Sequence, residues 1–166
     1  MRSSLRSALL TVAALVLFAL PASNAAASAQ CMFQFPITLS PGFSGMTPTS
    51  GTFTSNGATG KITCQGDAYG KAITGPGTMT VSGTYGDSGP ESCATPGKGH
   101  GTATMTLPTA DGTTTLDYAF TYQRYGAMGP FNSDGWNGGF GFMPTQGNCL
   151  SAPATAAMVY GGGMLG

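Results

Sequence analysis

The chain contains one histidine, His100, whose imidazole could serve as a general base or a metal ligand. No Ser-His-Asp motif and no second histidine accompany it, so we favour the alternative of a surface histidine without a catalytic role. Asp87 and Glu91 could form the paired carboxylates of a glycoside hydrolase, but they flank a Ser-Gly-Pro turn where acidic residues are common. A small hydrolase would need one of these groups in one cleft with a nucleophile. We therefore assign no catalytic residue and favour a protein that is not an enzyme.

The segment 131–140 contains the single tryptophan of the chain among glycines, amides and one carboxylate. A tryptophan ring stacks on sugar faces, and Asn and Asp side chains bond sugar hydroxyls. The segment therefore predicts a glycan site. Its candidate ligand-binding residues are Asn132, Asp134, Trp136 and Asn137. The alternative, to which we give more weight, is a long loop that pins its tryptophan into the end of a barrel as a plug.

Eight methionines follow Met1, and thioethers can bind Cu(I). They form no Met-x-Met or Met-x-x-Met cluster, so core filling explains them better. The segment 131–140 also lacks the distal acidic ligand of an EF-hand loop. We therefore expect no metal site and no cofactor.

The four cysteines predict two disulfides in an exported chain and contain no Cys-x-x-Cys spacing. If the strands alternate up and down, Cys31 and Cys93 lie at one end of the domain and Cys64 and Cys149 at the other. The pairing Cys31–Cys93 with Cys64–Cys149 is then preferred. The alternative is the sequential pairing, Cys31–Cys64 with Cys93–Cys149, because one miscounted strand reverses the argument.

Behind these candidates stands a pattern of alternating apolar and polar residues, which is typical of half-buried strands. Turn residues separate the alternating segments, and Asp111-Gly112 is the strongest hairpin signal. About eight strands are expected, at residues 33–39, 51–55, 60–65, 77–85, 99–107, 113–124, 139–143 and 154–161. No helical period is found beyond the first 29 residues.

The fold class is therefore all-β, with about eight antiparallel strands in a small meander barrel or a sandwich. An eight-stranded barrel is just wide enough to be filled by its side chains or to hold one small ligand. Large aromatic residues on the predicted inner face favour a filled interior, while interleaved glycine and alanine leave room for a cavity. The pattern places Met158 and Tyr160 on this inner face.

Residues 1–29 read as a secretory signal peptide, with early arginines, a 13-residue apolar run and a small-residue cleavage site. Thirteen residues reach about 20 Å, short of the roughly 30 Å of a bilayer core, so we expect no membrane span after cleavage. The remaining residues, 30–166, suit one secreted β domain. The expected location is extracellular or associated with the cell envelope.

Charge is scarce in this domain: four cations face six anions, without any charged run. Nucleic acid is therefore excluded as a partner, and uncharged ligands remain. The signal segment and the repeated Gly-Thr-x-Thr strand openings resemble small secreted proteins of high-GC Gram-positive bacteria, a resemblance that assigns no functional residue. We expect a secreted binding or envelope-associated structural protein, with a β-barrel carrier of a small apolar ligand as the alternative. Its oligomeric state is left open.

Overall fold

The computed structural model of the chain describes residues 28–166. Most of the predicted signal peptide, residues 1–29, therefore lies outside the described residues. Ala29, the last residue of that predicted segment, is the first residue of a strand, is completely buried and pairs with Leu165. The strand thus begins one residue before the predicted domain boundary.

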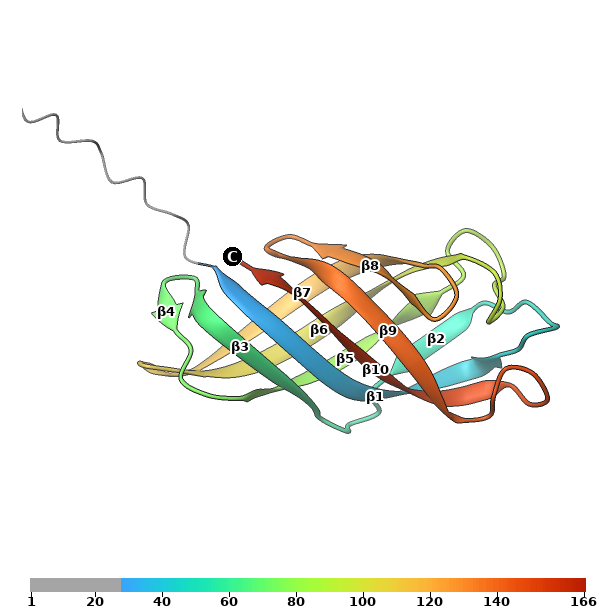
Figure 1. The fold of residues 1–166 in the computed structure, drawn as a ribbon, viewed down its shortest axis with the longest axis horizontal. Coiled ribbons are helices and arrows are strands. Elements are labelled where there is room, and N and C mark those ends of the chain that lie inside the picture. Colours follow the sequence, from blue (N-terminus) through green and yellow to red (C-terminus); the bar gives the residue numbers. More distant parts are fainter. Residues whose placement is uncertain (1–27) are drawn as a thin grey trace, which may run out of the picture.

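The described residues form ten antiparallel strands in one sheet and contain no helix, which confirms the all-β prediction. The strands are β1 (Ala29–Phe43), β2 (Gly51–Thr54), β3 (Gly60–Ala68), β4 (Lys71–Ala72), β5 (Gly77–Tyr85), β6 (Gly97–Thr109), β7 (Gly112–Arg124), β8 (Met128–Ser133), β9 (Trp136–Gln146) and β10 (Ala154–Leu165). Pairing of β10 with β1 closes the sheet into a ring of eight strand positions (Figure 1). Of the two predicted architectures, the structure is thus the meander barrel.

One strand position is shared by β2 and β3, which the sequence predicted as two strands. Both run antiparallel to β1, and both also pair with β5. Where the ladder is interrupted, Ser55 replaces part of it: its backbone N–H donates to the Val81 carbonyl at 2.9 Å, and its hydroxyl accepts from the Val81 N–H at 3.1 Å. The segment 55–59 is therefore an excursion within one barrel position.

The eighth position is filled by β8, which the sequence did not predict. Its six residues contain Gly129 and Pro130, which are typical of turns, and Phe131 is its one buried side chain. It pairs with β9 along its whole length but with β7 through three residue pairs only. The sequence counted β2 and β3 as two strands of the barrel and did not include β8. These two errors cancel, so the predicted number of eight barrel strands was right although two assignments were not.

Aromatic rings inside the barrel lie on glycines of the neighbouring strand. Phe53 faces Gly83, Phe120 faces Gly101, Tyr122 faces Gly99 and Phe33 faces Gly161, each as a direct cross-strand pair. A methyl group added to Gly101 would lie 2.9 Å from Phe120 Cζ, and one on Gly161 would lie 2.6 Å from Phe33 Cζ. Glycine is therefore required where two strands and a ring meet inside a narrow barrel.

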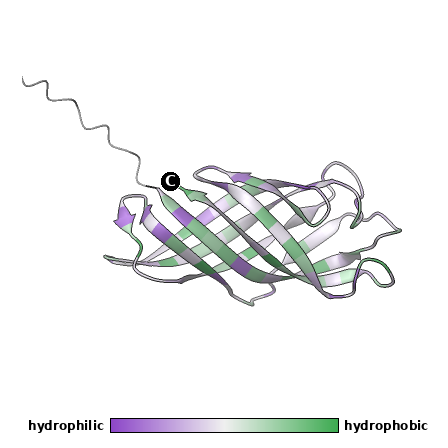
Figure 2. Cartoon of the chain, viewed as in Figure 1, coloured by the Kyte–Doolittle hydropathy of each residue, from purple (hydrophilic) through white to green (hydrophobic). Residues whose placement is uncertain are grey.

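The same packing corrects the predicted inner face of β10. Val159 is buried, Tyr160 is half exposed, and Met158 lies outside the buried core. Small residues of β10 face inward because the rings of β1 occupy the space above them. Figure 2 shows the resulting alternation of hydrophobic and hydrophilic residues along the strands.

The preferred disulfide pairing was wrong: Cys31 bonds Cys64, and Cys93 bonds Cys149. Cys31 and Cys64 are direct partners in the β1–β3 ladder. Because β2 and β3 form one strand position, the end of β3 lies beside the start of β1. The segments that carry Cys93 and Cys149 follow β5 and β9, and both leave the barrel at its opposite end.

Candidate ligand cavity inside the barrel

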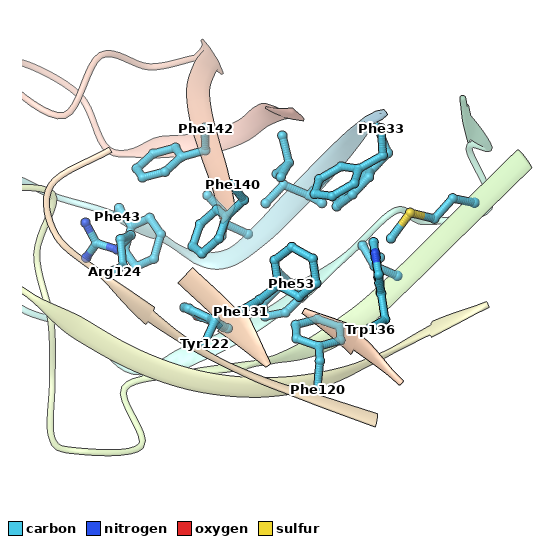
Figure 3. A pocket seen from close by; sticks show the side chains of 16 residues that line it. Phe33, Phe43, Phe53, Phe120, Tyr122, Arg124, Phe131, Trp136, Phe140 and Phe142 are labelled. Carbon is cyan, nitrogen blue, oxygen red and sulfur yellow. The ribbon is translucent and has the colours of Figure 1, made fainter. Parts of the chain in front are cut away.

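An apolar cavity of about 80 Å³ lies inside the barrel (Figure 3). Its wall is contributed by seven of the eight strand positions, all except β6, and eleven of its sixteen residues are aromatic or methionine. The lining residues are Phe33, Phe35, Ile37, Leu39, Phe43, Phe53, Met79, Val81, Phe120, Tyr122, Arg124, Phe131, Trp136, Phe140, Phe142 and Val159. The interior is thus neither completely filled nor widely hollow.

Three inward-facing rings, those of Phe120, Tyr122 and Phe140, are only partly buried, although their neighbours along the wall are buried. Tyr122 and Phe140 meet edge to face with ring centroids 5.5 Å apart, and Phe53 lies 6.0 Å from Tyr122. These separations are normal for aromatic pairs. The rings therefore support one another around the space rather than closing it.

A buried ion pair marks one end of the cavity. Arg124, the last residue of β7, donates from Nη2 to Glu91 Oε2 at 2.7 Å and to the Ser92 carbonyl at 2.7 Å. Its Nη1 donates to the Gly126 carbonyl at 2.6 Å, and the guanidinium carbon lies 4.7 Å from the centre of the Phe43 ring. The two charges offset each other, so this end of the cavity carries no net charge.

Sequence reasoning did not single out Arg124, although a signal was present. Tyr118, Phe120 and Tyr122 alternate with polar or small residues along β7, and the same period of two continues to Arg124. An arginine at an inward position requires a partner. The partner, Glu91, lies in the segment between β5 and β6, which the pattern did not place.

Burial raises the pKa of the Tyr122 phenol well above its usual range, and the nearby Glu91 carboxylate raises it further. Burial likewise raises the pKa of Tyr118, whose hydroxyl lies 2.8 Å from that of Tyr69, and the pKa of Tyr85. The phenols around the interior are therefore neutral at physiological pH.

The structure separates Trp136 from the other residues of the predicted glycan site, of which Asn132 and Asp134 line one surface pocket together with His100. Segment 131–140 is the β8–β9 hairpin rather than a long loop, and Trp136 is only 2% exposed. Its ring packs against Phe131, with centroids 4.5 Å apart, and against Phe33 at 5.5 Å. Trp136 is therefore not an exposed platform for a sugar ring, and the plug alternative describes its burial.

The other three predicted ligand-binding residues lie on the hairpin away from that ring. Asn132 and Asn137 are exposed partners across the β8–β9 ladder, and the Asn137 side-chain oxygen accepts from the Ser133 N–H at 3.2 Å. Asp134 belongs to the tight turn. The hairpin separates these polar groups from Trp136 because alternate residues of a strand point to opposite faces.

Asp87 and Glu91, the possible carboxylate pair, have different surroundings. Glu91 is buried with Arg124, whereas Asp87 is on the surface, where its Oδ2 lies 2.7 Å from His100 Nδ1. Thr84 also contacts this pair, donating to Asp87 Oδ1 at 3.1 Å. Both contacts of the His100 ring are made by its Nδ1 atom. Within residues 28–166 no hydroxyl forms a hydrogen bond with His100 Nε2, so the arrangement lacks the nucleophile contact of a Ser-His-Asp triad.

Metal chemistry also finds no support in the part of the chain that the structure describes, where no three His, Cys, Asp or Glu side chains gather. Met79 and Met105 are buried, as predicted for core-filling residues. Core filling does not explain all methionines, because several are more than half exposed. The exposed ones are Met32, Met46, Met128, Met143 and Met164.

Comparisons with known proteins give no relative: no family model, no curated protein and no solved structure matches the chain. Within residues 28–166, no helix has the length and apolar character needed to cross a membrane. The two disulfides indicate an extracellular or otherwise oxidising environment.

Proposed function

We propose that the protein is a non-enzymatic binding protein that holds a small apolar molecule inside its barrel. The observation that carries this proposal is the apolar cavity of about 80 Å³, lined by side chains from seven of the eight strand positions. Export through the segment 1–29 is part of the proposal, and the oxidising environment indicated by the disulfides supports it.

The chemistry of the wall favours an apolar occupant over water. A cavity of this volume exceeds the roughly 10–15 Å³ that one water molecule needs. A buried water, however, needs two to four polar partners, and the wall is made almost entirely of hydrocarbon and aromatic groups. Burial of apolar surface would therefore provide most of the binding free energy.

The surface glycan site is the weaker proposal. Sugar binding needs an exposed aromatic face beside polar groups, and the single tryptophan faces the interior. The exposed polar residues Asn132 and Asn137 lack such a face within the same hairpin.

Native mass spectrometry of the protein purified from its source tests the proposal. We expect a bound small molecule that is released on denaturation and extracted into organic solvent. Titration with 2-methylpropene provides a second test, because a ligand that binds the folded state raises the melting temperature.

The matched control is Val159→Phe, which adds a ring to the cavity wall. A folded Val159→Phe protein should show no rise in melting temperature with 2-methylpropene. Absence of both a copurified molecule and a rise in melting temperature with 2-methylpropene in the parent protein would contradict the proposed function.

A further inference from the structure

Two buried nitrogen atoms of the cavity-lining residues have no hydrogen-bond partner within residues 28–166: Trp136 Nε1 and Arg124 Nε. Figure 3 shows the two side chains at opposite ends of the pocket. Most buried donors in proteins are paired, and an unpaired one calls for an explanation. A ligand with an acceptor atom is one, because it would satisfy the donor when the cavity is occupied.

Trp136 is the donor better suited to a ligand. The guanidinium of Arg124 already donates to the Glu91 carboxylate and to backbone carbonyls, which fix it at the barrel end. Trp136 has no such bonds, and its surroundings are rings. The side chains of Phe33, Phe131 and Tyr118 hold the indole in place but leave its N–H unpaired.

The charge of the cavity limits the acceptor. Arg124 and Glu91 offset each other, so a carboxylate ligand would bring an uncompensated negative charge into an apolar interior. A neutral oxygen brings no charge and can accept one hydrogen bond. Carbonyl and ether oxygens are acceptors of this kind.

We propose that the ligand is a small neutral ketone, aldehyde or ether whose hydrocarbon part fills the cavity and whose oxygen accepts a hydrogen bond from Trp136 Nε1. This inference rests on the proposed function and adds the chemical class of the ligand. Trp136, predicted from the sequence to contact a glycan, is then a ligand-binding residue of the interior.

The test compares acetone with 2-methylpropene, which has the same shape but carries a CH₂ group in place of the carbonyl oxygen; both are small enough for the cavity. Binding is followed by NMR of protein labelled with ¹³C at the methionine methyl groups. Met79 lines the cavity and reports occupancy, whereas Met46 is 86% exposed and serves as the internal control. Both ligands should shift the Met79 signal and leave the Met46 signal unchanged.

The effect of Trp136→Phe isolates the hydrogen bond. We expect the variant to weaken acetone binding about tenfold and to change 2-methylpropene binding less than about twofold. Equal weakening of both ligands, or no weakening of either, would overturn the inference while leaving the proposed function standing. If neither ligand binds the parent protein, the proposed function itself fails.

A second measurement needs no variant. The chain has a single tryptophan, so its indole N–H gives one signal in a ¹⁵N spectrum. Acetone should move this proton signal downfield, as a new hydrogen bond does, and 2-methylpropene should not. An indole shift that is the same with both ligands would contradict the hydrogen bond even if Trp136→Phe does not fold.

Discussion

Arg124 Nη2 lies 2.7 Å from Glu91 Oε2, and both side chains are at most 2% exposed. The pair joins the last residue of β7, which lines the cavity, to the segment between β5 and β6. The Gly86 N–H also donates to Glu91 Oε1 at 2.7 Å. The Glu91 carboxylate thus links strand β7 to the segment between β5 and β6.

Removing the charge of Glu91 should cost much of the stability of the fold. In Glu91→Gln the buried guanidinium loses its counter-ion, and we expect a loss of about 3–5 kcal/mol in the free energy of unfolding, measured by urea denaturation. Asp87→Asn is the control, because the Asp87–His100 pair is exposed and contributes at most about 1 kcal/mol. Similar losses in the two variants would contradict the structural role of the buried pair.

The glycines beneath aromatic rings should not tolerate a methyl group. Gly101→Ala places a Cβ 2.9 Å from Phe120 Cζ and against the backbone of β5, so we expect a loss of about 1–3 kcal/mol. Gly139→Ala in β9 is the matched control, because its nearest atom would be 3.7 Å away. That variant should be neutral or slightly more stable, since alanine loses less backbone entropy than glycine on folding. Melting curves of both proteins check the prediction, which fails if Gly101→Ala is the more stable.

The two disulfides should differ in what they protect. The bond between Cys93 and Cys149 connects two segments at the Arg124 end, where the Cys93 N–H also donates to the Ser44 carbonyl at 3.0 Å. Replacing both cysteines by alanine should cost about 2–4 kcal/mol and increase amide exchange in residues 86–96 and 147–153.

Replacing Cys31 and Cys64 by alanine is the control for this local effect, because these residues also pair through the β1–β3 ladder. This variant should leave amide exchange of residues 86–96 unchanged relative to the rest of the barrel. Equal protection of that segment in both double variants would argue against its attachment through Cys93.

Stability should fall at alkaline pH because the pKa of Tyr122 is raised in the folded state. Below the unfolded pKa of about 10 the phenol is neutral in both states and the stability is fully present. Above it the unfolded state loses the proton first, so the free energy of unfolding falls by about 1.4 kcal/mol per pH unit for each such tyrosine. Urea denaturation from about pH 8 to about pH 11.5, a range that brackets the unfolded tyrosine pKa of about 10, measures how steeply the free energy of unfolding falls with pH. Tyr122→Phe should make this fall less steep, by the amount that corresponds to about one proton. An unchanged slope would contradict the burial of a neutral phenol.

Local patterns predicted most of the strands because side-chain alternation is recorded in the sequence itself. The hairpin at Asp111-Gly112 is confirmed, since Thr109 pairs with Gly112 at the turn between β6 and β7. What local patterns could not reveal was the interruption at Ser55, where a hydroxyl replaces part of the ladder. The error in strand direction that followed produced the wrong disulfide pairing.

The cavity was foreseen only as one of two possibilities because its existence depends on register. Whether Phe120 meets Gly101 or a larger residue is decided by which residues of β6 and β7 stand opposite each other. The inward direction of Trp136 depends likewise on its pairing with β8. The sequence did not predict this strand because it contains a glycine and a proline. The ion pair of Arg124 with Glu91 joins residues 33 positions apart and required the closed barrel.

A crystal structure determined under xenon pressure tests the central claim most directly, because xenon enters dry apolar cavities. The account predicts a xenon atom inside the barrel, among the rings of Phe53, Tyr122 and Phe140 that line the cavity. The atom should be absent from a Val159→Phe crystal treated in the same way. A barrel without xenon, with these rings packed across the space, would contradict the claim that the interior binds a small apolar molecule.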